Sequence, residues 1–462
     1  MQNSHTETFR TGAAAFLGMT AGAAVILSLP FAEKNFIFLV GVPFLFLVLV
    51  LAVVRIEAVV LLLLFSRALL DPFLEGTRII GGGFGLGALI NLFVIALTGI
   101  LFLRTLQWPA VDGLQKSWFF YLLFNAAAVV LSPVPVPAVK LFFNLVTYAC
   151  MALLPFFLIR SASGVRFWLK ALLGSSLLPV LAAHADWARG GIYFEDAGQR
   201  ILGSFTHPNI LAFYLVLVLA QVFLILKTPS FQLSRLQRNL LWLYLADLIL
   251  LLVATKSRNA WIACWLFFLV YGLLKDRRLL LACIAVPPFL LLLPDVRDRI
   301  KDLCYGTGSD SASRLNSFAW RLKLWKAGFE AALRENFLFG HGLGSFKILS
   351  TRFFISDAGV GAHNVYLEIL FETGLAGFTA FLAIFASSGA KLFAAFKKTA
   401  LGPWSAVYAA ALAYLASYLF ACAGDNMLYY LSFNWYCWFF LGVMLCAVRV
   451  SHDESLRHHS VV

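Results

Sequence analysis

Three short polar stretches interrupt an otherwise apolar sequence, and they hold the side chains that could do chemistry. They span residues 200–209, residues 255–259, and the paired segments 340–346 and 361–368. Histidines in these stretches can titrate near neutral pH and serve as general bases. The arginines carry planar guanidinium groups, which grip phosphate oxygens with two hydrogen bonds at once. The stretches therefore hold groups suited to proton transfer and cations suited to binding an anion.

His363 is the residue that we expect to act as the general base. It lies where a long polar loop re-enters an apolar run, within reach of both water and a membrane-bound substrate. On a helix at about 100° per residue, Tyr366 shares its face and Glu368 does not. We expect Asn364, Tyr366 and Glu368 to support the site, with capping or a bond to another helix as the alternative role of Glu368. His341 is the rival base.

The composition excludes a water-soluble globular protein. Of 462 residues, 61% are hydrophobic and 13% are charged, whereas soluble domains average about 25% charged residues. The mean hydropathy is +0.86. In a membrane protein the excess of basic residues, 36 Lys and Arg against 23 Asp and Glu, indicates how the chain is oriented in the membrane and that it contacts anionic lipid. We therefore expect membrane lipid, and no nucleic acid, as a partner.

Apolar runs predict an all-α, polytopic transmembrane helix bundle of about 12–14 spans, because a helix satisfies its own backbone in lipid. The runs lie near residues 12–30, 36–54, 57–70, 84–103, 117–132, 138–159, 167–183, 208–226, 239–254, 259–274, 279–293, 364–390, 404–422 and 427–448. Pro133, Pro135 and Pro137 are expected to end a helix.

The distribution of Lys and Arg over the short loops favours cytoplasmic termini and an outward-facing long loop. The chain then divides into N-terminal transmembrane helices (1–183), central transmembrane helices (184–294) that include an outer loop (184–207), a long periplasmic loop (295–362), C-terminal transmembrane helices (363–448) and a cytoplasmic tail (449–462). The chemistry is expected to face the periplasm or cell exterior.

The long loop contains a predicted amphipathic helix from Arg314 to Glu335. Apolar residues recur there at three- and four-residue spacing: Leu315, Phe318, Leu322, Trp325 and Phe329. With basic residues among them, the pattern is typical of a helix that lies in the membrane surface. An ordinary helix that packs on the bundle is the alternative.

The other candidate residues each have a structural alternative. Arg258 and Lys256 lie on the outer side, where the positive-inside rule disfavours basic residues, so we expect Arg258 to function; the alternative is a snorkelling anchor. His207 and Asn209 are expected to support the site, although His207 could simply cap a helix. Glycines 340, 342 and 344 have no strand before them, so they predict a tight turn rather than a nucleotide site.

No metal site or cofactor is expected. The sequence contains no Asp-x-Asp motif, no outward carboxylate cluster and no Cys or Cys/His spacing suited to zinc. Negative charge on a substrate can be stabilised by a metal ion or by guanidinium groups. We therefore expect arginine to carry this charge.

The motifs together resemble the O-antigen ligase and O-antigen polymerase superfamily of bacterial membrane glycosyltransferases. The similar segments are Gly203–Asn209, Ser257–Arg258, Arg321–Trp325 with Gly328, Gly340–Phe346, and His363–Glu368 with Glu372–Gly377, in this order within residues 195–445. The resemblance implies a GT-C-like enzyme of the bacterial inner membrane, active on the periplasmic face. By motif position His363 would be its essential histidine, and Arg200 and Arg258 the first diphosphate ligands, with Arg314 and Arg321 placed less securely.

The implied reaction moves a glycan from an undecaprenyl-diphosphate carrier to an acceptor hydroxyl. The acceptor is either another glycan, in a polymerase of surface or exported polysaccharide, or a lipid A core, in an O-antigen ligase of lipopolysaccharide biosynthesis. The Thr-His-Pro-Asn element at 206–209 favours the polymerase. A transporter or flippase for lipid-linked sugars is the non-enzyme alternative, but only Asp247 is a convincing charged residue in mid-helix.

Overall fold

The computed structural model describes residues 55–76, 85–105, 113–194, 198–290, 317–354, 359–399, 402 and 404–459. The chain forms two units, 1–67 and 68–462. The predicted runs 12–30 and 36–54, together with Arg314, lie outside the described residues. In the first unit the structure describes α3 (Ile56–Arg67), which coincides with the run predicted at 57–70.

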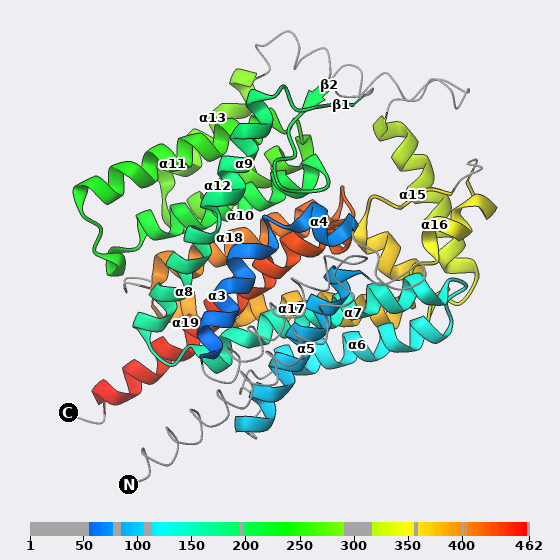
Figure 1. The fold of residues 1–462 in the computed structure, drawn as a ribbon, viewed down its shortest axis with the longest axis horizontal. Helices are drawn as coiled ribbons and strands as arrows, with labels where there is room; N and C mark the ends of the chain where they lie inside the picture. Colours follow the sequence, from blue (N-terminus) through cyan, green and yellow to red (C-terminus); the bar gives the residue numbers. More distant parts are fainter. Residues whose placement is uncertain are drawn as a thin grey trace, which may run out of the picture. The chain divides into compact units, whose positions relative to one another are not determined.

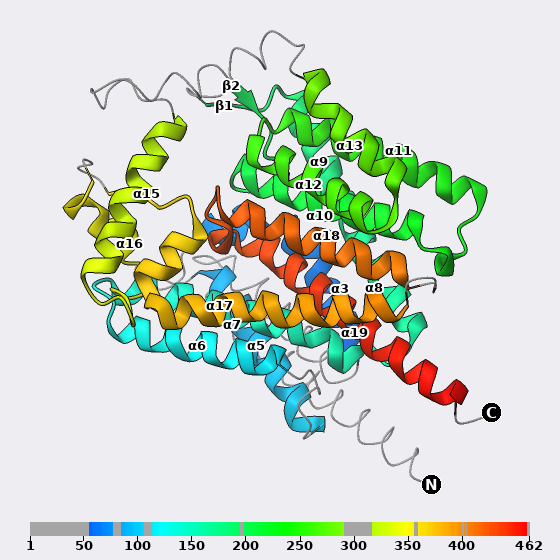
Figure 2. The same ribbon diagram turned by 180° about the vertical axis from the view of Figure 1, so that it is seen from behind.

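Over its described residues the second unit is all-α apart from one short hairpin, as Figures 1 and 2 show. Its first helices are α4 (Asp71–Gly76), α5 (Leu86–Thr105), α6 (Leu114–Val130), α7 (Pro135–Leu158), α8 (Ala162–Ser175) and α9 (Leu177–Ala188). Strands β1 (Ile192–Phe194) and β2 (Gly198–Arg200) pair antiparallel, with Ile192 opposite Arg200. The later helices are α10 (Pro208–Lys227), α11 (Arg235–Ala254), α12 (Arg258–Lys275), α13 (Arg277–Leu290), α15 (Ser317–Arg334), α16 (Phe346–Leu349), α17 (Val365–Lys398), α18 (Ser405–Cys422) and α19 (Leu431–His459). Single turns η2, η4 and η5 span Pro229–Phe231, Ser350–Arg352 and Met427–Tyr429.

Eight helices of the described part are long and apolar enough to cross a membrane, so the polytopic bundle is confirmed. They are Leu86–Thr105, Pro135–Leu158, Ala162–Ala188, Pro208–Lys227, Arg235–Ala254, Val365–Lys398, Ser405–Cys422 and Leu431–Ser451. Two of the three prolines at 133–137 behave differently from the prediction: α7 starts at Pro135 and includes Pro137, because a helix tolerates proline in its first turn.

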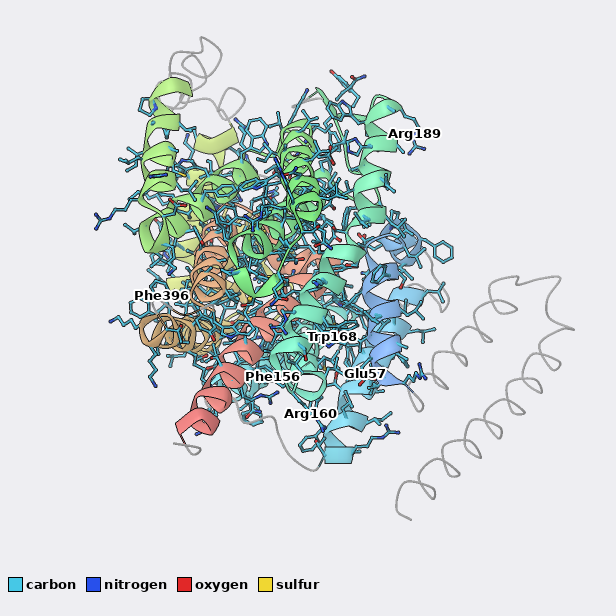
Figure 3. The ribbon with its side chains drawn as sticks, turned by 90° about the vertical axis from the view of Figure 1, so that its left-hand side faces the viewer. Glu57, Phe156, Arg160, Trp168, Arg189 and Phe396 are labelled. Carbon is cyan, nitrogen blue, oxygen red and sulfur yellow. The ribbon has the colours of Figure 1, made fainter. Side chains whose placement is uncertain are left out.

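The centre of the bundle is formed by α10 and α19, each about 89% buried over its apolar window. A helix that is apolar on all sides must be buried in lipid or among other helices, and here other helices cover both. α19 lies against α7 and α8, and Trp168 of α8 packs edge-on against Phe439 of α19. Figure 3 shows Trp168 inside the unit, with Arg160 and Arg189, which flank α8 and α9, at opposite ends. This core fixes the ends of the spans, where the polar stretches lie.

α15 runs across one end of the bundle, transverse to α6 and α17 (Figures 1 and 2). Its buried face includes Leu324 and Ala332, which pack in one cluster with residues of α16 and α17. Leu322 and Phe329, on the other face, are 42% and 47% exposed. The helix therefore packs on the bundle and also keeps an exposed face on which apolar side chains alternate with basic ones.

The glycine-rich turn 340–344 docks by backbone contacts onto a break in α17. Gly374 inside α17 has φ 65°, and the backbone N–H of Gly342 donates to the Glu372 carbonyl at 3.0 Å. A Cβ at Gly340 would lie 2.4 Å from the Glu372 carbonyl carbon. Gly340 must therefore be glycine, because a side chain there would clash with the backbone of α17.

Gly340→Ala and Gly344→Ala form a matched test of this docking. Both glycines have φ +74°, so each substitution carries a similar cost of placing alanine in the left-handed region. A Cβ at Gly344 meets only the Val134 side chain at 3.8 Å, so Gly340→Ala should lower the free energy of unfolding by about 1–3 kcal/mol more. Thermal unfolding in detergent measures the difference; equal melting temperatures would contradict the docking.

Candidate active site

The polar stretches meet at one end of the transmembrane helices. The hairpin and turn between α9 and α10, the turn between α11 and α12, and the connection between α18 and α19 all lie there, and α17 begins there. Side chains join them: Asn259 donates to the Ala421 carbonyl at 3.1 Å, and Asn209 Nδ2 donates to Asp425 Oδ2 at 2.8 Å. Residues far apart in sequence therefore form one site.

Arg200 ties the first two stretches together. Its Nε donates to the Thr255 carbonyl and its Nη2 to Asn209 Oδ1, both at 2.7 Å. The guanidinium also lies 5.5 Å from the centre of the Phe194 ring across the hairpin. Arg200 is thus a well-held cation, with part of its donor capacity already used by the protein.

Asp425 is the functional candidate that the sequence did not reveal. It is 4% exposed, and its Oδ2 accepts from Asn209 Nδ2 at 2.8 Å. Its Oδ1 accepts from the Tyr430 hydroxyl at 2.6 Å and from the Asn426 backbone N–H at 2.8 Å. The available signal is a lone carboxylate in the short connection between the last two apolar runs, and a lone carboxylate does not form the cluster that indicates a metal site.

Arg321 and His363 lie beside this carboxylate. Arg321 of α15 donates from Nη1 to the carbonyl of Gly424 at 3.1 Å. Burial of the imidazole and then the positive charge of Arg321 lower the pKa of His363 from 6.5, and Asp425 opposes this shift. His363 is therefore neutral at neutral pH, the form in which imidazole accepts a proton.

His207 and Asn364 both cap helices. The His207 Nδ1 accepts from the Asn209 backbone N–H at 3.1 Å at the start of α10, and the Asn364 side chain accepts from the Leu367 N–H at 3.1 Å at the start of α17. His207 therefore does cap a helix, which is the alternative role that the sequence predicted for it. His207 nevertheless lies close enough to His363 to contribute to its lowered pKa.

Lys256 and Arg258 occupy the turn between α11 and α12. Lys256 has φ 53° and is exposed, with its Nζ 3.6 Å from where a Cβ at Gly198 would lie. Arg258 is the first residue of α12 and is also exposed. Both cations therefore face outward from the same end of the bundle as Arg200.

His341 and Glu368 have partners outside this group. The His341 ring stacks on Phe371 at 4.2 Å, and its Nε2 lies 3.8 Å from Glu335. Glu368 accepts from the Tyr429 hydroxyl at 2.9 Å, so it bonds to another element, as the alternative reading expected. Tyr366 likewise donates to the Leu419 carbonyl of α18 at 2.6 Å.

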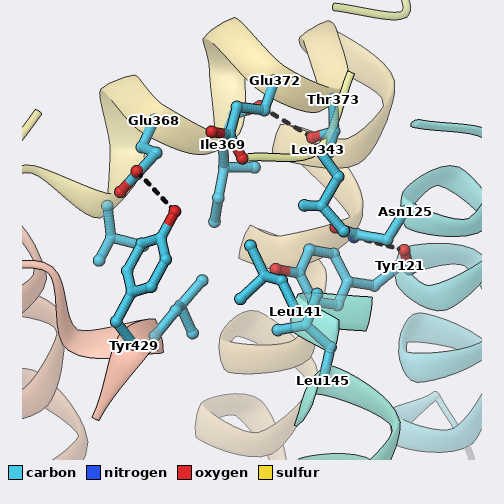
Figure 4. A pocket seen from close by; sticks show the side chains of 12 residues that line it. Tyr121, Asn125, Leu141, Leu145, Leu343, Glu368, Ile369, Glu372, Thr373 and Tyr429 are labelled. Carbon is cyan, nitrogen blue, oxygen red and sulfur yellow. Dashed lines mark hydrogen bonds between the residues drawn. The ribbon is translucent and has the colours of Figure 1, made fainter. Parts of the chain in front are cut away.

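A small cavity of about 20 Å³ lies next to Glu368, between α6, α7 and α17 (Figure 4). Glu372 also lines it, and its carboxylate accepts the backbone N–H groups of Gly344 at 2.8 Å and Phe346 at 3.1 Å. A cavity of this size holds about one water molecule, not a sugar. These two carboxylates therefore hold the glycine-rich turn and η5 in place.

In the part of the chain that the structure describes, three His, Cys, Asp or Glu side chains do not converge in a group suited to a metal ion. Several buried polar atoms have no hydrogen-bond partner within the described residues, and Asn426 Oδ1 is the one in the connection that holds Asp425. The side chain of Asn426 lies beside Gly361, 3.1 Å from where a Cβ would stand. A substrate hydroxyl could donate to such an acceptor.

Opposite shifts of the His363 pKa are expected from two neighbouring substitutions. Arg321→Gln removes a positive charge and should raise this pKa, whereas Asp425→Asn removes a negative charge and should lower it further. Diethyl pyrocarbonate attacks only neutral imidazole, so its rate of modification of His363, followed by mass spectrometry across pH, measures both. Asp276→Asn, at the other end of α12 in an ion pair with Lys227, is the control. Shifts of the same sign would refute this electrostatic arrangement.

Comparison with protein families identifies one segment. Residues 243–382 match a family described as O-Antigen ligase. The match includes Arg258, Arg321, His341 and His363, while Arg200, His207, Asn209 and Asp425 lie outside it. A comparison with curated proteins gave no match.

Proposed function

Since residues 243–382 match a family described as O-Antigen ligase, we propose that the chain is a glycosyltransferase that uses an undecaprenyl-diphosphate-linked glycan as donor. The acceptor is a hydroxyl of a second glycan or of a lipid A core. The proposed location is the inner membrane, with the site facing the periplasm. The convergence of His363, Arg321 and Asp425 at one end of the spans is the observation that carries the proposal.

In the proposed reaction the acceptor hydroxyl attacks the anomeric carbon of the donor. A new glycosidic bond forms, the bond from that carbon to the diphosphate oxygen breaks, and undecaprenyl diphosphate leaves with the electron pair. His363 takes the hydroxyl proton, which its lowered pKa favours by keeping the ring neutral beforehand. Asn426 Oδ1, a buried acceptor, is suited to orient a sugar hydroxyl.

Arginine is proposed to stabilise the diphosphate in place of a metal ion. Arg200 is held by Thr255 and Asn209, so it supplies a fixed positive field. Arg258 is exposed at the start of α12, and a planar guanidinium there can grip two phosphate oxygens. Arg321 lies close enough to His363 to lower its pKa, so its guanidinium is available to the departing diphosphate as well. Lys256 adds positive charge beside them.

Between the two acceptors we favour the glycan, and hence a polymerase of surface or exported polysaccharide. The Thr-His-Pro-Asn element at 206–209 is the feature that favours it, and within that element Asn209 binds Arg200 and Asp425 in the site. The ligase is the second candidate, supported by the matched family itself.

The decisive assay supplies purified protein with lipid-linked oligosaccharide, with and without lipid A core. We expect chain growth from the oligosaccharide alone, whereas capping of the core would identify a ligase.

His363→Ala should lower the rate of glycosyl transfer by about 10²- to 10⁴-fold, because the general base is lost. His341→Ala, whose ring stacks on Phe371, is the matched control and should keep most activity. An inactive His341 variant beside an active His363 variant would exchange their roles.

Arg258 is tested by comparing Arg258→Ala with Arg258→Lys. The alanine variant should raise the KM for the donor or lower kcat by at least about 10-fold, and lysine should restore only part because it lacks the two-pronged fork. Arg189→Ala, which changes another exposed arginine at the end of α9, is the control.

Glycosyl transfer is expected to persist in excess EDTA, because arginine rather than a metal ion is proposed to stabilise the diphosphate. Complete loss of activity in EDTA and its recovery with Mg²⁺ would overturn this proposal.

A further inference from the structure

The backbone around His363 is held in an unusual conformation. His363 has φ +47°, in the left-handed region that a residue with a side chain seldom adopts. Such a conformation costs free energy and persists only where the surroundings impose it. The contacts on either side of His363 therefore decide where its imidazole points.

One contact on the N-terminal side comes from α15. The indole N–H of Trp325 donates to the carbonyl of Ala362, the residue before His363, at 2.7 Å. Further back, the Val360 N–H donates to Ser350 Oγ at 2.9 Å. On the C-terminal side Asn364 caps α17. The Trp325 indole thus holds the peptide before His363, and the side chain of Asn364, the residue after it, caps the N-terminus of α17.

The same helix also holds the opposite side of the site. Arg321 and Trp325 are four residues apart, which places them on one face of α15. Arg321 donates to the carbonyl of Gly424, the neighbour of Asp425, while Trp325 donates to the neighbour of His363. α15 itself is fixed by Leu324 and Ala332 in its apolar cluster. One rigid helix therefore spaces the loop of Asp425 from the loop of His363.

We propose that Trp325 is a positioning residue for His363: its indole N–H holds the Ala362 peptide and thereby aims the imidazole at the acceptor hydroxyl. This proposal rests on the proposed function, because it assumes that His363 removes the proton of the acceptor hydroxyl. Trp325 itself need not touch the substrate. Its contribution should appear in the turnover number and in the surroundings of His363, and much less in donor binding.

Two substitutions separate the hydrogen bond from the packing. Trp325→Phe keeps an aromatic ring and loses the donor. Trp325→His keeps an N–H at the equivalent position of a five-membered ring and loses the larger part of the indole surface. Trp320→Phe is the control, because Trp320 lies on the same helix and packs edge-on against Phe354 in the same cluster.

Misplacement of a catalytic group by about 1 Å can cost about 100-fold in rate. We therefore expect Trp325→Phe to lower kcat by about 10- to 100-fold with the donor KM within about twofold. Trp325→His should recover most of this loss above pH 7, and Trp320→Phe should stay within about twofold of the wild type. If Trp325→His is as impaired as Trp325→Phe, or Trp320→Phe equals both, packing alone explains Trp325 and the proposal fails.

A second readout does not depend on glycosyl transfer. In Trp325→Phe the loop should loosen, so diethyl pyrocarbonate should modify His363 faster and its pKa should return toward the ordinary value, while Trp320→Phe leaves both unchanged. If this pattern holds in a protein that transfers no glycan, the positioning stands and the proposed function fails. If transfer is normal in Trp325→Phe and His363 reacts as in the wild type, the positioning fails and the function stands.

Discussion

A single buried carboxylate, that of Asp425, holds the site together. A buried carboxylate is costly unless several donors surround it, and Asp425 accepts from the Asn209 side chain, the Tyr430 hydroxyl and its neighbour's backbone N–H. Asn209 in turn accepts from Arg200, which also binds the carbonyl of Thr255. Loss of the carboxylate would leave the Asn209 amide, the Tyr430 hydroxyl and the Asn426 N–H without an acceptor, and Arg200 would lose the anchor of its partner Asn209.

The membrane explains why everything irregular gathers at the ends of the helices. Inside lipid a backbone must satisfy its own hydrogen bonds, which helices do and open turns do not. The exception within α17 is the break at Gly374, where the backbone of residues 337–342 supplies the missing partners, while the Glu372 carboxylate accepts the N–H of Gly344 in the turn. Polar side chains of the spans thus serve the fold, and those of the connecting segments are left for chemistry.

The sequence predicted the helices and the three polar stretches well, because each depends on local composition. It also placed His363 at the start of a helix, where α17 indeed begins after an Asn364 cap. It could not show Asp425, whose meaning depends on Asn209 at a separation of 216 residues. Nor could it show that Glu368 accepts a hydrogen bond from Tyr429. Hydropathy predicts the length of each transmembrane helix but not which of its faces packs against a neighbouring element.

That separation of 216 residues also bears on how the protein is made. A chain enters the membrane from its N-terminus, at about 5–20 residues per second, and the segment with Arg200 and Asn209 precedes α18 by nearly half the chain. Until α18 and Asp425 emerge, Asn209 and Arg200 have no carboxylate to organise them. A half-translated chain therefore holds no assembled site, and biosynthesis itself delays any use of lipid-linked substrate until the last spans are in place.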